Sequence, residues 1–406
     1  MSDLKNDLKM KKIGSILGWC LVRGIKTFGN VASFVVRQFV DVKPGKVVCW
    51  AHNYKQYGCN PRYITEYLLR HYPDMEIVWV FRSGVDTSSV PKEVKCVRFK
   101  SLEYLKAINS AEFLLSNLRT DPWHAYWHKR PGQKYLMLWH AGVALKKIER
   151  DAEANLGFSY LQKAKRDSKV ADLMISGCKM QTSLLKEKFW YDGEILEAGI
   201  PRNDIFFDSS RHTEIRQRVL NKYGINQSNK VVLYAPTFRR NGNLDSYRLD
   251  WQSLLPHLRN MLGGDVSIML RLHPNLIGKV DRSSLLCHDA VTDVTLYDDI
   301  HELLCIADLL ITDYSSSMFD YSLQKRPCLL YTCDADSYDR GYYFSLDELP
   351  YPVAYNQDQL IEAIKNFDQS DYDRRLTEFF DHRIGNLERG EAAKSLALWM
   401  RSHSSK

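Results

Sequence analysis

Residues 308–331 read DLLITDYSSSMFDYSLQKRPCLLY, and this stretch decides the fold class of the chain. Two short apolar runs, at 308–312 and 327–331, enclose a segment with a helical pattern. A strand, a helix and a second strand in this order predict two parallel strands, because the helix carries the chain back to the starting edge of the sheet. A cluster of hydroxyl and carboxylate side chains, residues 312–317, lies between the first strand and the helix.

The same alternation continues outward from this unit in both directions. Further strands are predicted at 231–235, 266–272 and 290–294, and before them at 46–51, 76–81, 94–99, 112–116, 134–140, 172–176 and 194–199. Helical segments such as 62–71 and 101–109 separate the strands. Continuous apolar strands between helices are typical of parallel sheets that are covered on both faces. We therefore predict an α/β protein of two tandem, doubly wound, Rossmann-like domains with a cleft between them.

The chain divides into three parts on this interpretation. Residues 1–43 form a basic, helical N-terminal segment, 44–210 form the first Rossmann-like domain, and 211–406 form the second, closed by C-terminal helices. A length of 406 residues suits two domains that each bury a core, and 45% hydrophobic with 26% charged residues excludes wholesale disorder. The net charge of +7 is compatible with anionic lipid, nucleic acid or a phosphate-rich substrate.

The cysteines and the N-terminus indicate where the protein works. Nine cysteines occur without a CxxC pair or metal-ligand spacing, which favours a reducing compartment and hence the cytoplasm. Basic residues run through 1–40, and the uncharged stretches 13–22 and 27–36 are each shorter than the ~20 residues that a spanning helix needs. We expect this segment to lie on the cytoplasmic face of the cell membrane as an interfacial helix, with a helix packed on the protein body as the alternative.

Four polar clusters follow predicted strands, at the sheet edge where doubly wound domains bind ligands. His140 ends the 134–140 strand beside a small-residue turn, which suits a general base or else a histidine hydrogen-bonded within its loop. Arg239 follows the 231–235 strand and offers a planar fork for phosphate oxygens. Arg271 and His273 end the 266–272 strand and could stabilise charge on a phosphate, or else form a salt bridge with an acidic neighbour. The fourth cluster, 312–317, precedes a helix start, which caps exposed amides and binds anions.

These clusters together resemble the CDP-glycerol glycerophosphotransferase family, the teichoic-acid primases and polymerases with a type B glycosyltransferase fold. The similar motifs extend from about residue 139 to 344 and follow in the family's order. They are WHAGVALKK (139–147), GIPRND (199–204), YAPTFR (234–239), RLHP (271–274), DIHELLCIADLLITDYSSSMFDY (299–321) and PCLLYTCDADSYDRGYYF (327–344).

The resemblance implies transfer of a polyol-phosphate unit from a CDP-polyol to a hydroxyl of a polymer or of a lipid-linked primer, with release of CMP. His140 would deprotonate the acceptor hydroxyl, and His273 with Arg271 would contact the donor pyrophosphate. The other donor-binding residues implied are Pro201, Arg202, Thr237, Arg239, Asp313, Ser315, Ser316 and Ser317. Asp313 would orient its neighbours, and Asp320 would be structural. No metal or other cofactor is required.

The acceptor side carries less resemblance. Lys146 and Lys147 are expected to contact the acceptor, as are Trp123 and Trp127 in a loop rich in Trp and His, although an ordinary aromatic packing loop is equally consistent with that composition. The family's commonest form has Gly-Thr-Pro after the histidine, whereas this chain has Ala141-Gly142, so CDP-glycerol and CDP-ribitol both stay open as donors.

Two other functions fit the same sequence. One is a nucleotide-sugar glycosyltransferase of the same architecture, and the other is a non-catalytic membrane scaffold of a polymer-export assembly. The basic residues are dispersed and no nucleic-acid motif is present, so we do not expect nucleic acid as a partner. The number of units added, the acceptor and any homo-oligomer are left open by the sequence.

Overall fold

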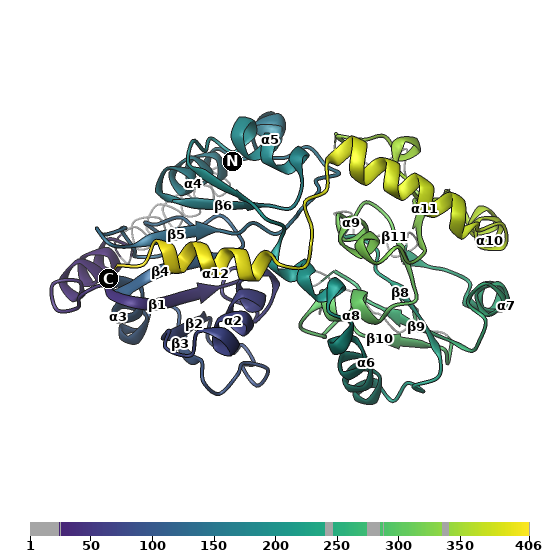
Figure 1. The fold of residues 1–406 in the computed structure, drawn as a ribbon, viewed down its shortest axis with the longest axis horizontal. Helices are drawn as coiled ribbons and strands as arrows, with labels where there is room; N and C mark the ends of the chain where they lie inside the picture. The colour runs from purple at the N-terminus through teal and green to yellow at the C-terminus, as the bar shows by residue number, and fades with distance from the viewer. Residues whose placement is uncertain are drawn as a thin grey trace, which may run out of the picture.

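The structure is a computed structural model of the chain, and it describes residues 24, 26–239, 247–273, 285, 286, 288–334 and 341–405. Two lobes lie side by side along the long axis of the molecule (Figure 1). Each lobe contains a parallel sheet with helices on its faces, seven-stranded in the N-terminal lobe and six-stranded in the C-terminal lobe. The predicted pair of doubly wound α/β domains is therefore confirmed.

The N-terminal sheet has the strand order β3-β2-β1-β4-β5-β6-β7, and every neighbouring pair is parallel. Its strands are β1 (Lys43–Trp50), β2 (Ile77–Phe81), β3 (Lys95–Arg98), β4 (Ala111–Ser116), β5 (Lys134–Met137), β6 (Leu173–Ser176) and β7 (Glu194–Glu197). The order reverses between β1 and β4, so the connections that follow these two strands lead away in opposite directions. Such a reversal leaves a crevice beyond the carboxyl ends of the two strands.

The C-terminal sheet has the order β10-β9-β8-β11-β12-β13, again all parallel. Its strands are β8 (Lys230–Tyr234), β9 (Val266–Leu270), β10 (Val291–Asp293), β11 (Leu309–Thr312), β12 (Cys328–Tyr331) and β13 (Val353–Ala354). Sequence patterning missed β13, because two residues are too short to produce a recognisable apolar run. The reversal here lies between β8 and β11, which brings the ends of these strands together.

Helices cover both faces of each sheet (Figure 1). The α-helices are α2 (Cys59–His71), α3 (Leu102–Ser110), α4 (Phe158–Val170), α5 (Lys179–Lys188), α6 (Ser209–Tyr223), α7 (Trp251–Leu262), α8 (Ile300–Ile306), α9 (Ser317–Tyr321), α10 (Gln357–Lys365), α11 (Gln369–Glu378) and α12 (Ala392–Ser402). Short 3₁₀ segments include η1 (Glu149–Asn155), η2 (Pro201–Phe207) and η6 (Ser322–Gln324), and a π-helical turn, η9 (Phe379–Ile384), follows α11. The start of α7 illustrates the local signals: the Asp250 side chain accepts from the amides of Gln252 and Ser253.

The last helix departs from the predicted domain boundary. Leu396, Trp399 and Met400 of α12 are buried in the core of the N-terminal sheet, and the Trp399 indole donates to Glu194 of β7 at 2.8 Å. Residues 392–405 therefore belong to the N-terminal lobe rather than to the second domain (Figure 1). The amphipathic pattern of a helix gives its buried face but not the sheet that this face covers, so the sequence could not reveal the crossing.

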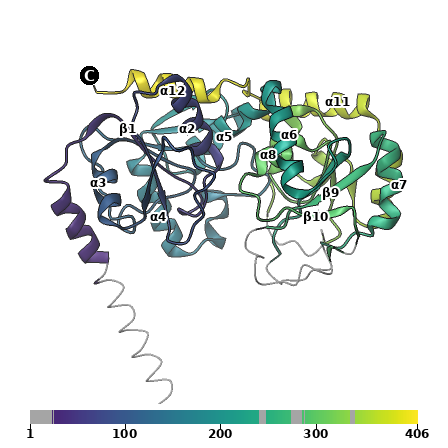
Figure 2. The same ribbon diagram turned by 90° about the horizontal axis from the view of Figure 1, so that it is seen from below.

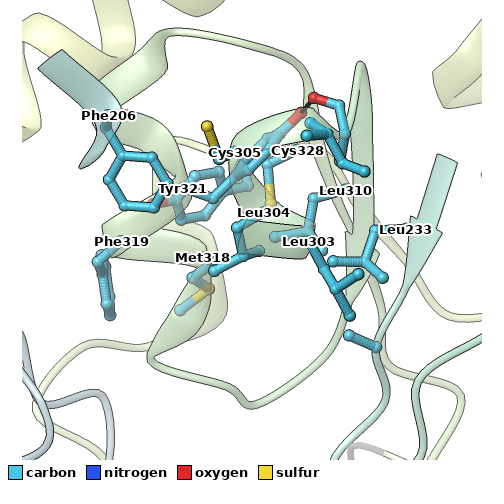
Figure 3. Close-up of a cluster of buried hydrophobic side chains, with 14 of the residues drawn as sticks. Phe206, Leu233, Leu303, Leu304, Cys305, Leu310, Met318, Phe319, Tyr321 and Cys328 are labelled. Atoms are coloured by element: carbon cyan, nitrogen blue, oxygen red, sulfur yellow. Dashed lines mark hydrogen bonds between the residues drawn. The ribbon is translucent and has the colours of Figure 1, made fainter. Parts of the chain in front are cut away.

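The two lobes share an apolar core and buried ion pairs. Phe206, in the connecting segment η2, packs among Phe319 and Tyr321 of the C-terminal lobe (Figure 3). Beside this core, Arg62 of α2 pairs with Asp299 at 3.1 Å and with Glu302 at 2.6 Å. These contacts fix the carboxyl edge of one sheet against that of the other.

The N-terminal helix, over residues 26–36, buries polar side chains and exposes apolar ones. Asn30 and Ser33 face the lobe, where His128 Nε2 lies 2.9 Å from Asn30 Oδ1 and Asn109 donates to Ser33 at 2.9 Å. Exposed apolar side chains are Phe28, Val31, Phe34 and Val35 on this helix and Phe39 just beyond it. The helix projects from the lobe in Figure 2. Among the described residues, no helix is long and apolar enough to cross a bilayer, and residues 1–23 of the predicted segment lie outside this part of the chain.

Candidate functional site

The first side chain of the site, His140, stands where β5 leaves the sheet. The strand was predicted to reach residue 140 but ends at Met137. The fully buried Asn60 of α2 explains the difference, because its amide donates to the carbonyl oxygens of Leu138 at 2.8 Å and Trp139 at 3.0 Å. Trp139 adopts a positive φ of 50°, which turns the chain sharply just before His140.

His140 lies in a polar environment that includes the positively charged side chain of Arg202. Its Nδ1 is buried, with no hydrogen-bond partner among the described groups. Burial, helped by the positive potential of His52 and Arg202, lowers the pKa of His140 to about 3. The imidazole is therefore uncharged at neutral pH and has a nitrogen lone pair available to accept a proton.

His52 and Asn117 complete this corner of the site, and sequence reasoning missed both. They follow β1 and β4, and the His52 amide donates to Asn117 Oδ1 at 2.9 Å while the two side chains meet at 3.3 Å. His52, Asn53 and Tyr54 have φ values of 47°, 58° and 68°. Three successive non-glycine residues in the left-handed region are uncommon and occur mainly where surrounding contacts enforce them. Their position at strand ends was the available signal.

Arg202 lies at the joint between the lobes. Its Nη1 donates to the carbonyl oxygen of His140 at 2.5 Å, and its Nη2 pairs with Asp320 of α9 at 2.6 Å. Asp320 also lies 3.3 Å from His301, so it holds two side chains, as expected of a structural residue. Pro201 opens η2 and is buried. The structure thus gives Arg202, predicted as a donor contact, partners that tie the His140 loop to the second lobe.

The guanidinium of Arg239, which was predicted to bind phosphate oxygens, forms ion pairs with two carboxylates. It bonds Asp334 through Nε and through Nη2 at 3.0 Å, and it pairs with Asp313 at 2.8 Å. Its Nη1 donates to the carbonyl and hydroxyl oxygens of Thr237. Asp313 in turn accepts from the Thr237 amide at 2.9 Å, so it orients its neighbours as the sequence suggested. Two carboxylates cancel the charge of this guanidinium, and its structural task is to hold the loops after β8 and β12 together.

Arg271 retains a positive charge at the end of β9. Its Nη1 donates to the carbonyl oxygens of Val294 at 3.3 Å and Tyr297 at 2.7 Å. No carboxylate of the described chain lies within ion-pairing distance of Arg271, so the salt bridge considered as its alternative role is not formed there. Burial lowers its pKa, yet a guanidinium stays protonated in proteins. The carbonyls hold the group without neutralising it.

Lys146 of the N-terminal lobe lies near enough to His273 of the C-terminal lobe to affect its pKa. Desolvation lowers the pKa of His273, and the positive charges of Lys146 and Arg271 lower it further. Lys146 comes from the segment after His140, which pairs with residues 341–343 of the second lobe: the Lys147 amide donates to Gly341 at 2.8 Å and the Tyr343 amide to Leu145 at 2.8 Å. The two predicted catalytic histidines have different neighbours, and the 145–147 segment links their surroundings.

The serine cluster starts a helix that is shorter than predicted. α9 has five residues and continues as the 3₁₀ turn η6. Ser315 and Ser317 hydroxyls lie 2.7 Å apart, and the Ser317 amide donates to Ser315 Oγ at 3.3 Å. Ser316 is the N-cap residue by position but makes no side-chain cap. Ser315 and Ser316 are half-buried at the end of β11, next to the loop that Asp313 orients.

The structure separates the two tryptophans that were predicted to contact the acceptor. Trp127 is fully buried: its indole donates to Gln133 at 3.1 Å and its ring packs edge-on against Tyr135. A core side chain cannot touch an acceptor, so this prediction is wrong for Trp127. Trp123 is 42% exposed and remains available at the surface of the same loop.

The described residues contain no group of three or more His, Cys, Asp or Glu side chains that could hold a metal ion. The expectation that the reaction needs no metal stays a prediction.

A family model described as CDP-Glycerol:Poly(glycerophosphate) glycerophosphotransferase matches residues 31–398 of this chain. A teichoic acid poly(glycerol phosphate) polymerase of Staphylococcus epidermidis is 32% identical over 368 residues, which cover 87% of this chain and 50% of that protein. A teichoic acid glycerol-phosphate transferase of Staphylococcus aureus is 33% identical over 356 residues, which cover 84% of this chain and 89% of that protein.

A solved structure shares the fold at similar identity. A histidine-to-asparagine variant of the wall teichoic acid polymerase TagF, soaked with CDPG, has a TM-score of 0.79 and 29% identity, covering 94% of this chain and 96% of that one. The chain spans about half the length of the S. epidermidis polymerase and most of the S. aureus transferase.

Proposed function

We propose, because the chain belongs to the CDP-glycerol:poly(glycerophosphate) glycerophosphotransferase family, that it transfers glycerol phosphate from CDP-glycerol to a hydroxyl of an acceptor. The acceptor oxygen attacks the β-phosphorus, the bond from this phosphorus to the bridging oxygen breaks, and CMP leaves with the electron pair. A phosphodiester forms, and the hydroxyl proton passes to a base. The observation that carries the proposal is the family match over both lobes, including the histidine, arginine and serine clusters at the strand ends.

His140 is the base in this proposal. Its buried, unpartnered Nδ1 and its uncharged state suit proton acceptance. A pKa of about 3 makes the free imidazole a weak base. The negative charges of a bound pyrophosphate would raise that pKa, because an opposite charge nearby favours the protonated form. Donor binding then prepares the base for the acceptor.

Arg271 and His273 are proposed to hold the donor pyrophosphate and to stabilise the charge that develops on CMP. A cation anchored by two carbonyls, with no described carboxylate in ion-pairing distance, is preorganised for an anion. Ser315, Ser316 and Thr237 are proposed as neutral donors to the phosphates. Arg239 contributes by positioning these loops, since Asp313 and Asp334 already occupy its guanidinium. Positioning and charge stabilisation supply most of the rate in such transfers.

The test is a donor panel with the purified chain. CDP-glycerol, CDP-ribitol, UDP-glucose and UDP-N-acetylglucosamine are each incubated with a synthetic oligo(glycerol phosphate), and CMP or UDP release is measured. We expect CMP release with a CDP-polyol. The product chains should differ in mass from the acceptor by whole polyol-phosphate units. UDP release in place of CMP would instead establish the nucleotide-sugar glycosyltransferase. The rate of CMP release with CDP-glycerol relative to that with CDP-ribitol identifies the donor, which the Ala141-Gly142 sequence leaves open.

The site of action is proposed to be the membrane surface, through the helix over residues 26–36. Its exposed apolar face includes Phe28 (76% exposed) and Phe34 (60%), followed by Phe39 (82%). Aromatic residues with flanking cations such as Lys26 and Arg37 bind the boundary between headgroups and acyl chains. A lipid-linked or membrane-bound acceptor would be reached from there.

A further inference from the structure

A cavity of about 650 Å³ lies in the N-terminal lobe, apart from the donor side of the site. It opens beyond the carboxyl ends of β1 and β4, where Trp50 and Ser116 line it. The strand order reverses between these two strands, so the cavity occupies the crevice in which doubly wound sheets bind ligands. Of the residues singled out from the sequence, Trp123 alone lines it.

Two arginines of the cavity wall are already neutralised. Arg119 is buried and pairs with Asp167 at 3.1 Å and with Glu149 at 3.3 Å. Arg166 pairs with Asp121 at 3.1 Å. These groups build the wall and leave little net charge facing the cavity.

Three further cations line the cavity without such partners. Lys26, Arg82 and Lys163 come from the N-terminal helix, the end of β2 and α4. No described carboxylate lies within ion-pairing distance of any of them, and the Arg82 side chain donates through Nε to the carbonyl oxygen of Asn53 at 2.9 Å. Lys26 and Lys163 are half-buried and Arg82 is exposed at the rim, so an anionic ligand in the cavity would form charge-assisted hydrogen bonds with cations that no described carboxylate pairs.

Neighbouring groups respond to this positive potential. Burial lowers the pKa of Lys100, and the charges of Lys26 and Arg82 lower it further. Burial together with the charges of Lys100 and Lys26 lowers the pKa of His124, on the cavity wall, to about 4. His124 is therefore an uncharged hydrogen-bonding group beside the cations, and the cavity carries net positive charge at neutral pH.

The rest of the wall is aromatic. Trp123 is 42% exposed and Phe158 is 77% exposed, and Tyr54 lies deeper. Aromatic faces pack well against the CH groups of polyols, whereas the cations match phosphate oxygens. A ligand that alternates carbon backbone with phosphodiester fits both features.

The cavity adjoins the proposed base through consecutive residues. Asn53 and Ser116 line the cavity, and the next residues inward, His52 and Asn117, bond each other. His52 acts on the pKa of His140, and the Asn117 backbone contacts the His140 ring. A chain lying in the cavity would thus present its end to His140.

We propose that this cavity binds a phosphodiester of the acceptor chain, behind the terminal hydroxyl that His140 deprotonates. The inference rests on the proposed function and names the acceptor class as a polyol-phosphate chain. The phosphate could also come from a lipid headgroup. The helix proposed to bind the membrane carries Lys26 and is held to the cavity rim, where the Asn30 side-chain amide donates to the Trp123 carbonyl at 2.9 Å.

The experiment compares two acceptors in the full-length chain: a synthetic oligo(glycerol phosphate) and free glycerol, which has the hydroxyl but no phosphate. The variants are R82Q/K163Q and the single K163Q, with K169Q on the exposed side of α4 as the matched control and K163R to keep the charge at position 163. Thermal unfolding checks that each variant is folded. Loss of two charge-assisted contacts should raise the KM for the oligomer at least about tenfold. The KM for CDP-glycerol and the activity on free glycerol should stay unchanged, and K163R should recover part of the loss relative to K163Q.

Three results would overturn the inference or separate it from the proposed function. An unchanged oligomer KM in R82Q/K163Q overturns it. If the oligomer KM is unchanged in R82Q/K163Q but the variant no longer binds phosphatidylglycerol vesicles, the cavity binds a lipid headgroup, and the inference is also overturned. If the wild-type chain releases no CMP with either acceptor, the proposed function fails. Calorimetric binding of the oligomer to wild type and to R82Q/K163Q still tests the cavity: weaker binding by the variant supports it, and equal binding overturns it.

Discussion

His140 illustrates how burial decides the behaviour of a single side chain. Its pKa of about 3 means that the free enzyme carries an uncharged imidazole at any pH above that value. The ratio kcat/KM reports groups of the free enzyme. We therefore expect kcat/KM for CDP-glycerol to show no acid limb from His140 between pH 8 and 5. A fall in kcat/KM with a midpoint near pH 6.5 that disappears in H140N would contradict this.

Replacement of the same residue tests its chemical role. H140N keeps a hydrogen-bonding side chain but cannot accept the proton, so we expect kcat to fall by ~10²-fold or more, the usual contribution of a positioned acid–base group. Binding of CDP-glycerol, measured by calorimetry, should persist. His382 is exposed in η9 and belongs to none of the strand-end clusters, so H382N serves as the control. A scaffold without catalysis would show equal function in H140N and H382N.

The Arg202–Asp320 pair links the His140 loop to the second lobe and should contribute to stability. Both side chains are only 5% exposed, and Asp320 also contacts His301. D320N leaves a buried guanidinium without its carboxylate, and removing one partner of such a pair typically costs about 3–5 kcal/mol of unfolding free energy. Urea unfolding measures this. D371N breaks the exposed pair with Arg374 and should leave the free energy of unfolding nearly unchanged.

The sequence could place the chemically interesting residues at strand ends but not their partners. Arg239 was predicted to bind phosphate oxygens, because the carboxylate of Asp334 that pairs with it comes from a loop far along the chain. The pair of Arg202 with Asp320 of α9 is equally long-range. For Trp127 the sequence left acceptor contact and aromatic packing equally open, because burial depends on the sheet beneath the loop. Long-range pairing sets these outcomes, and a local pattern does not contain it.

At the scale of elements, the helix over residues 26–36 carries the clearest prediction. The exposed phenylalanines on this helix, and Phe39 just beyond it, suit a membrane surface. We expect F28S/F34S/F39S to lose most of its binding to phosphatidylglycerol vesicles in co-sedimentation. L102S, at an exposed leucine outside this helix, is the control. Equal sedimentation of both variants would favour the alternative in which the helix only packs on the lobe.

Strands and helices were the most predictable part of the molecule. Every strand predicted from an apolar run is present in the structure. A parallel strand is covered on both faces, so its successive side chains are all apolar and form a continuous run in the sequence. The ends differ where a side chain from elsewhere intervenes: Asn60 captures the carbonyls of residues 138 and 139, so β5 stops before His140. The helix predicted after the serine cluster is present as α9, followed directly by the 3₁₀ turn η6.

For the whole molecule, the joint between the lobes should make stability depend on pH. Glu388 is buried, accepts from Asn203 at 2.9 Å and from the Ile200 amide at 3.0 Å, and has a pKa raised to about 8 by burial. Because its unfolded pKa is about 4.3, the folded state binds the extra proton between these values, and the unfolding free energy falls as pH rises. We expect E388Q to lose part of this decline between pH 5 and 8 in urea unfolding. Parallel curves for wild type and E388Q would exclude the mechanism.

The two-domain organisation was predictable from the break in strand patterning, whereas the path of the C-terminus was not. α12 returns to the first lobe, and its amides at Ala392 and Ala393 donate to Asp204 in the outgoing segment at 3.0 and 2.8 Å. The outgoing and returning chain thus cross the joint side by side.

Neighbouring covalent crossings limit how far two bodies can separate or slide past each other. At this joint the outgoing and returning segments are bonded together, and Arg62 pairs with Asp299 and Glu302 beside them. The lobes are therefore tethered at points that lie far apart in the sequence. The relative position of the strand ends that carry His140 and Arg271 is thus inherited from the fold rather than imposed by a ligand.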